Sequence, residues 1–192
     1  CQSGKFSHSD KSYRQIFENT NYLNFSKDLI WEARLSAARS AFFNQEYETA
    51  QSLLDDIIKA TNAPIDKVAR AEFYLGDVIS EQTDRTPTNL IEAVVHYQKV
   101  AREMTNSSLN TAAWGRMGDC YFQLGNLSQA LVSYNTATKL PGADVTIRSQ
   151  AKLGLARVLS EQALAVDEID KNQQLLQQSL DHCFEIVFGS NL

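Results

Sequence analysis

Few side chains of this 192-residue chain have the type and spacing that catalysis or metal binding requires. The three histidines, His8, His96 and His182, are far apart in sequence, and none stands at metal-ligand spacing from a cysteine or an acidic residue. No glycine-rich phosphate loop occurs, and no GxSxG nucleophile motif occurs either. The sequence therefore predicts a protein that is not an enzyme and that uses no metal and no cofactor.

The three cysteines do not form a disulfide framework. Cys120 and Cys183 lie in apolar helical patterns, so we expect both to be small core residues and not reactive thiols. Cys1 begins the chain and precedes a short polar run, as in a mature bacterial lipoprotein with a lipidated first cysteine. A trimmed chain or a fragment of a longer protein would begin in the same way. We expect lipid attachment at Cys1 and a location at the bacterial cell envelope, with a cytoplasmic location as the alternative.

The composition restricts the class of partner. Hydrophobic residues make up 43% and charged residues 21% of the chain, which is ordinary for a globular protein. The net charge is −5 and no basic stripe occurs, so we expect no nucleic-acid binding. No apolar run approaches the roughly 20 residues of a membrane span, so membrane contact is expected only through a lipid at Cys1. A protein or a peptide is the expected partner.

Residues Thr111 to Asp144 carry the pattern that organises the chain. Each half places apolar and small residues on one helix face, and Gly125-Asn126 is the expected turn between the halves. A glycine inside a helix costs about 1 kcal/mol relative to alanine, so Gly118 requires a packing reason. We expect Gly118 to meet Ala130 where two helices cross closely. The residues of the pattern are Trp114, Met117, Gly118, Tyr121, Ala130, Tyr134, Ala137 and Pro141.

This pattern resembles one unit of the tetratricopeptide repeat family. Weaker matches around Ala38, Leu75-Gly76-Asp77 and Leu153-Gly154 extend the resemblance over about residues 26 to 188. The resemblance implies an all-α fold, a tetratricopeptide-like α-solenoid of about four antiparallel helix pairs. The expected units are about 31–64, 68–106, 111–144 and 147–188. Residues 26–192 would form this repeat domain, and residues 1–25 an N-terminal arm or tether.

Two segments depart from the standard unit. Gly76 and Ala93 are 17 residues apart, whereas Gly118 and Ala130 are 12 apart, so five extra residues fall within the run EQTDRTPTN. We expect a surface loop there that includes Pro87. The closing segment, 172–189, has glutamines opposite its apolar positions, and we expect it to be a capping helix with a polar, solvent-exposed outer face.

The resemblance also implies a binding surface. In the tetratricopeptide family the first helix of each pair lines a concave groove that takes peptides or helices of other proteins. Asp77 and Asp119 would be neighbours in that groove and would favour a basic or amphipathic segment, although solvated acids on an unused face would look the same. These two acids are unlike the Lys, Asn and Arg clamp of chaperone-binding members. The expected groove residues are Arg39, Phe42, Phe73, Asp77, Asp119 and Phe122.

The function that the resemblance implies is a non-enzymatic protein–protein interaction module that binds a peptide or a helical segment. A role in assembly or scaffolding as an envelope lipoprotein would fit. The alternative is a structural or oligomerising repeat domain excised from a longer chain. An enzyme, or a small-ligand binder with a pocket between helices, is a third interpretation that no residue pattern supports.

Overall fold

The computed structural model describes residues 27–82, 86–104, 109–141 and 143–189. Over these residues the secondary structure is helical and contains no strand, which confirms the all-α class. The expected arm of residues 1–25, including Cys1, lies outside the described residues, so lipid attachment stays a prediction. None of the described helices combines the length and the apolar character that crossing a membrane requires.

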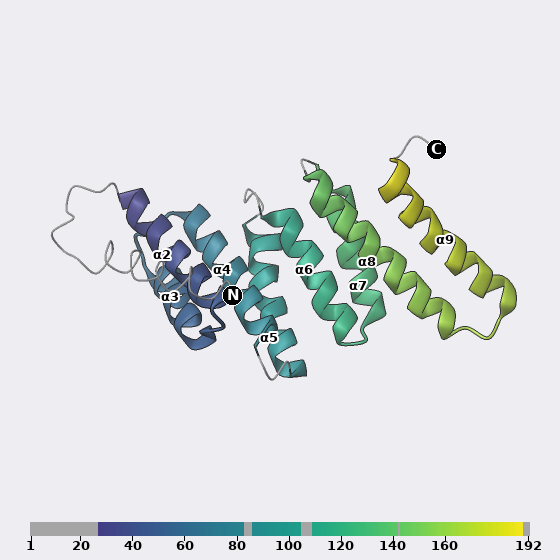
Figure 1. Cartoon of the computed structure of the whole chain (residues 1–192), viewed down its shortest axis with the longest axis horizontal. Helices are drawn as coiled ribbons and strands as arrows, with labels where there is room; N and C mark the ends of the chain where they lie inside the picture. Colours follow the sequence, from purple (N-terminus) through teal and green to yellow (C-terminus); the bar gives the residue numbers. More distant parts are fainter. Residues whose placement is uncertain (1–26, 83–85, 105–108, 142, 190–192) are drawn as a thin grey trace. The chain divides into compact units, whose positions relative to one another are not determined.

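The first of two compact units reaches to Leu109. Each of its helices packs against the next one, and α2 also contacts α4 (Figure 1). Helix α3 therefore packs against both α2 and α4. In chain order the helices are α2 (Lys27–Phe43), α3 (Tyr47–Lys59), α4 (Ile65–Ser80), α5 (Pro87–Gln98) and the π-helix η1 (Lys99–Glu103).

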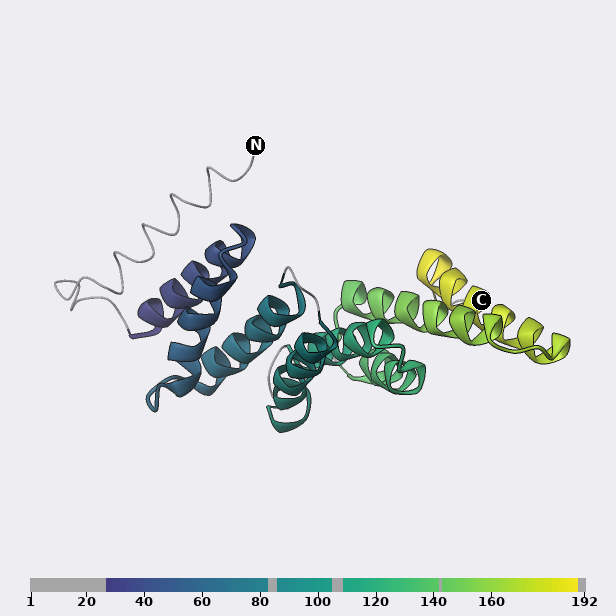
Figure 2. The same ribbon diagram turned by 90° about the horizontal axis from the view of Figure 1, so that it is seen from below.

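The second compact unit begins at Asn110, and the extent of the repeat domain stays a prediction. Consecutive helices again pack together, and α6 also contacts α8. Figure 2 shows α8 and α9 side by side along their length. The helices are α6 (Asn110–Gln123), α7 (Leu127–Lys139), α8 (Val145–Leu164) and α9 (Ile169–Phe188).

The turn between α6 and α7 confirms the prediction for Gly125-Asn126. Gly125 has φ 71°, in the left-handed region that glycine adopts without strain. The side chain of Asn126 caps α7 by accepting a hydrogen bond from the backbone N–H of Gln129 at 3.2 Å. In the turn between α2 and α3 the left-handed residue is Gln45, with φ 64°, and Glu46 makes no side-chain cap bond. The two turns have the same geometry, and the second unit has the more favourable residues for it.

The connection between α4 and α5 is shorter than expected. Pro87 is the first residue of α5 and not a loop residue, because a proline lacks only an N–H that the first helical turn leaves unpaired anyway. Thr86 caps this helix by accepting a hydrogen bond from the backbone N–H of Asn89 at 3.2 Å. The middle of the predicted loop, residues 83–85, lies outside the described residues.

The ring of Tyr134 lies nearest to the position that a Cβ atom on Gly118 would take. A Cβ atom on Gly118 would lie 2.5 Å from the ring of Tyr134, and one on Gly154 would also lie 2.5 Å from it. Tyr134 projects from α7 and is 2% exposed, so its ring fills the space that the glycines of α6 and α8 leave. In the first unit, a Cβ on Gly76 would lie 2.6 Å from the ring of Tyr97 in the same way. The mid-helix glycines therefore make room for tyrosine rings.

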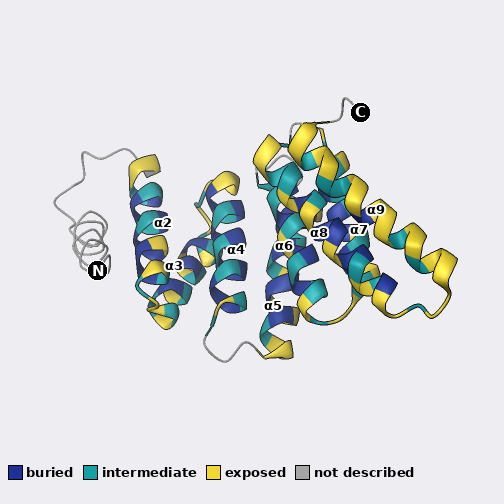
Figure 3. Cartoon of the chain, turned by 45° about the vertical axis from the view of Figure 1, so that its right-hand side comes forward, coloured by how far each residue is buried: buried dark blue, intermediate teal, exposed yellow. Residues whose placement is uncertain are grey.

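Burial separates the interior of each unit from its surface. Figure 3 shows buried faces turned toward neighbouring helices within each unit, and largely exposed residues on α9. Cys120 is 2% exposed, as expected for a core residue. Cys183 is only half-buried, because α9 buries little of its surface against α8.

Candidate functional site

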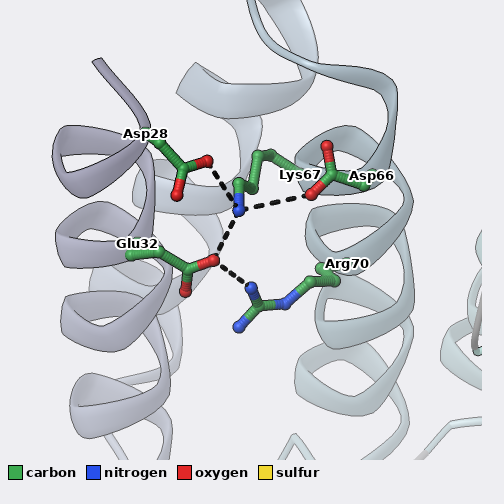
Figure 4. Close-up of polar contacts among 5 residues, drawn as sticks. All are labelled: Asp28, Glu32, Asp66, Lys67 and Arg70. Carbon is green, nitrogen blue, oxygen red and sulfur yellow. Dashed lines mark hydrogen bonds and ion pairs between the residues drawn. The ribbon is translucent and has the colours of Figure 1, made fainter. Parts of the chain in front are cut away.

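Charged side chains join the first helices α2 and α4 (Figure 4). The ammonium group of Lys67 lies 2.6 Å from Glu32, 2.9 Å from Asp28 and 3.2 Å from Asp66. Arg70 donates to the same oxygen of Glu32. The hydrogen bond from Lys67 is the main reason that the pKa of Glu32 is below its ordinary value, and the bond with Glu32 raises that of Lys67. These charges serve to hold the two helices together.

Glu72 forms a second polar cluster, between α4 and the segment of α5 and η1. Its side chain is 3% exposed; one oxygen accepts from Lys99 at 2.9 Å and the other lies 2.6 Å from Nδ1 of His96. Burial pushes the pKa of Glu72 up, but the hydrogen bonds from His96 and Lys99 outweigh burial, so the pKa lies below its ordinary value. Both carboxylate oxygens are used to bind the second helix of the pair to the first.

The two acids predicted for the groove each accept a hydrogen bond from a buried tyrosine. The hydroxyl of Tyr97 donates to Asp77 at 2.7 Å, and the hydroxyl of Tyr134 donates to Asp119 at 2.7 Å. Burial, followed by the charge of Asp119, raises the pKa of Tyr134. Packing within each unit therefore already uses one carboxylate oxygen of Asp77 and one of Asp119. Asp77 belongs to the first unit and Asp119 to the second. Contact of either acid with a partner stays a prediction.

A double-mutant cycle on Tyr134 and Asp119 tests this bond. A hydrogen bond to a charged group contributes about 1.5–3 kcal/mol, so Tyr134→Phe and Asp119→Ala should show a coupling of at least about 1 kcal/mol in urea denaturation. Tyr121→Phe, at a half-buried tyrosine of α6, paired with Asp119→Ala provides the control cycle. A Tyr134–Asp119 coupling no larger than that of the control would mean that the bond does not stabilise the fold.

The other expected groove residues of the first unit have different environments. Arg39 is exposed, and its guanidinium lies 5.3 Å from the centre of the Tyr74 ring, so it links α2 to α4. Phe42 is half-buried at the end of α2 against neighbouring aromatic rings. Phe73 is 7% exposed and packs 5.6 Å from the ring of Tyr97. Placing Phe73 in an exposed groove is therefore wrong, because its side chain belongs to the core.

A similar arginine–aromatic pair joins the first helices of the second unit. Phe122 of α6 is half-buried, and the guanidinium of Arg157 from α8 lies 4.4 Å from its ring centre. Asp119 lies one helical turn before Phe122, and its second carboxylate oxygen is 3.8 Å from Arg116. Sequence reasoning missed Arg157 and the corresponding Tyr74, because cation–π partners on separate helices have no fixed spacing.

A polar pocket of about 660 Å³ lies where the first turns of α3 and α5 approach each other. Part of its lining is already paired, since the side-chain amide of Asn89 donates to Gln82 at 3.2 Å. Across the described residues, no three His, Cys, Asp or Glu side chains converge as metal ligands would. The lining residues of the pocket are Gln45, Glu46, Tyr47, Glu48, Thr49, Gln82, Thr86 and Asn89.

Comparison with known proteins identifies a similar fold. A scan against protein-family models finds no match. No curated protein matches the chain either. The crystal structure of BtubC (BKLC) from P. vanneervenii is similar, with a TM-score of 0.64 and 17% sequence identity over 96% of this chain and 76% of that chain. At this identity the likeness concerns the fold alone.

Proposed function

We propose that this chain is a non-enzymatic protein-interaction module of the tetratricopeptide type, which binds a peptide or helical segment of another protein along its first helices. One observation carries the proposal: the same helix-pair design recurs in both units. A glycine and the acid after it lie on the first helix, and a tyrosine from the second helix packs on the glycine and bonds to the acid. The residues are Gly76, Asp77 and Tyr97 in one unit, and Gly118, Asp119 and Tyr134 in the other.

This recurrence supports a repeat architecture, since a repeated unit buries its apolar face against its neighbours and presents equivalent surfaces. On the first helices those surfaces carry Arg39 with Tyr74, and Arg157 with Phe122. Arginine and aromatic side chains are the types that contribute most to protein interfaces. Rigid helices hold them in place, which lowers the entropy cost of binding.

The charges on the first helices of each unit favour an amphipathic segment. In the first unit Asp77 of α4 supplies negative charge and the exposed Arg39 of α2 supplies positive charge, and in the second unit Asp119 of α6 and the exposed Arg157 of α8 do the same. A purely basic segment would meet these arginines, so a segment with apolar residues and both signs of charge fits better. Catalysis has less support, because Glu32, Glu72 and Tyr134, whose pKa values are shifted, each bond to another helix.

Affinity capture from the source organism, with the purified chain as bait, tests the proposal. Arg39→Glu with Arg157→Glu should reduce recovery of specific partners at least about tenfold, the effect of losing roughly 1.4 kcal/mol of binding free energy. Lys59→Glu with Lys139→Glu is the matched control: it makes the same charge change at exposed sites on the second helices α3 and α7. Equal loss in both variants, or loss in neither with the helical circular dichroism intact, would contradict the proposal.

A further inference from the structure

Helix α9 has two apolar faces. The first faces α8, where the hydroxyl of Ser179 donates to the backbone carbonyl of Ala156 at 2.9 Å and Glu185 pairs with Lys152 at 2.8 Å. The second lies roughly a third of a turn around the helix and is exposed. We call this second face the α9 stripe; its residues are 42 to 71% exposed and comprise Ile169, Leu176, Leu180, Phe184, Val187 and Phe188.

Within the described part of the chain, helices α3 and α7, unlike α9, each pack against a helix on two sides. Helix α3 packs against both α2 and α4, and α7 packs against both α6 and α8. Among the described residues, α8 is the helix against which α9 packs extensively (Figure 2). The exposed side of α9 therefore offers the kind of surface that α3 offers to α4 and α7 offers to α8. That surface accommodates a helix.

The size of the stripe is sufficient for a specific contact. With side chains that expose about 150 to 250 Å² when fully accessible, its six residues leave on the order of 500 Å² of apolar surface. One partner of a standard interface contributes about 800 Å², of which roughly 500 Å² is apolar. Patches of this size on monomeric proteins are often functional.

The charge along one edge of the stripe defines the occupant. Asp170 and Asp181 are exposed on the edge away from α8, and Gln177 between them donates to Asp181 at 2.9 Å. The one lysine of α9, Lys171, projects from the opposite side of the helix to the stripe. A second copy docked through the same stripe with its α9 antiparallel, about a two-fold axis, would bring the acidic edges together, which disfavours that self-association.

We propose that the α9 stripe docks one amphipathic helix of another protein. The apolar face of that helix covers Leu176, Leu180 and Phe184, and lysine or arginine residues along its edge pair with Asp170 and Asp181. This surface is separate from the face of the first helices, and its occupation does not depend on the function proposed for that face.

Two synthetic helical peptides of about the length of α9 test the proposal by fluorescence anisotropy. They share one leucine stripe and carry either lysine or glutamate at the flanking positions. The lysine peptide should bind at least about tenfold more tightly, and Asp170→Lys with Asp181→Lys should reverse that preference. Phe184→Glu should abolish binding of both peptides. The matched control is Val132→Glu, since Val132 is 53% exposed on α7, outside the stripe, and its loss should leave binding unchanged.

Four outcomes would overturn the proposal. Phe184→Glu and Val187→Glu change two exposed positions of the stripe. If both variants are folded and still bind the peptides, the stripe is not the binding site. Self-association in analytical ultracentrifugation that Phe184→Glu removes would identify a second copy as the occupant. Co-sedimentation with phosphatidylcholine vesicles that Phe184→Glu removes would identify a lipid surface. Equal binding of both peptides to every charge variant would show that basic residues of the partner helix do not pair with Asp170 and Asp181.

Discussion

Replacing Gly118 or Gly154 by alanine is expected to destabilise the chain by about 1–3 kcal/mol, whereas the same change at Gly115 should stabilise it by up to about 1 kcal/mol. At Gly118 and Gly154 the new methyl group would lie 2.5 Å from the ring of Tyr134. That ring is 2% exposed and lies between α6 and α8, so it has no space to move into. Repulsion therefore exceeds the usual gain in helix propensity.

Gly115 provides the matched control because it lies on α6 with Gly118, and a Cβ there would have no neighbour within 4 Å. Thermal unfolding followed by circular dichroism measures the difference, at about 2–4 °C per kcal/mol for a chain of this size. Equal melting temperatures for the variants at Gly115 and Gly118 would show that the ring of Tyr134 moves aside easily.

Removing both hydrogen-bonding partners of Glu72, by His96→Leu with Lys99→Met, is expected to destabilise the chain by about 3–5 kcal/mol. Glu72 is 3% exposed, so the double variant leaves a carboxylate in the interior without its two partners. His96 and Lys99 are themselves 16% and 36% exposed, so the opposite change, Glu72→Met, costs less because both side chains can reach water. Adding Glu72→Met to the double variant should therefore recover most of the lost stability.

The pH dependence of this change has a definite sign. In the native protein the pKa of Glu72 is below its ordinary value, so its contribution is present above the unfolded pKa of about 4.3 and is lost as the pH falls through the folded value. In the double variant burial acts without the two hydrogen bonds and raises the pKa, so stability increases as the pH falls toward about 4.3.

Urea denaturation between about pH 4 and pH 7 measures how the free energy of unfolding changes with pH in the native protein and in the double variant. The control is Glu48→Gln, because Glu48 is an exposed acid of the same unit and its replacement should change stability by no more than about 0.5 kcal/mol. Parallel pH profiles for the native protein and the double variant would mean that His96 and Lys99 do not set the ionisation of Glu72.

Spacing along the chain predicted which residues share a helix face, but not which residue lies across from them. The turn at Gly125-Asn126 was predictable because its geometry depends on two adjacent residues. Gly118 was correctly identified as a packing position, but the ring of Tyr134 against it was not predicted, because several residues of the second helix fit one hydrophobic pattern. Phe73 was assigned to the surface for the same reason, since its contact with Tyr97 depends on how two helices cross.

The polar contacts of the site were harder to predict from the sequence than the apolar contacts, because they depend on tertiary structure. Lys67 and Glu32 are 35 positions apart, and Tyr134 and Asp119 are 15 apart, so neither pair has a local signature. The hydrogen bonds that Asp77 and Asp119 accept from tyrosine hydroxyls were likewise not predicted. The π-helix was not predicted, because helical periodicity does not separate one extra residue in a turn from regular α-helix.

The position of Tyr134 has a consequence for cooperativity. One ring occupies the space of a missing methyl group on both α6 and α8, so neither helix can separate from α7 without exposing it. Separating α6 from α7 and separating α8 from α7 both expose the ring of Tyr134, so the two events are energetically coupled. Helices α6, α7 and α8 therefore unfold as one foldon. Helix α9, in which Ser179 is the buried residue, detaches at lower free energy and frays first.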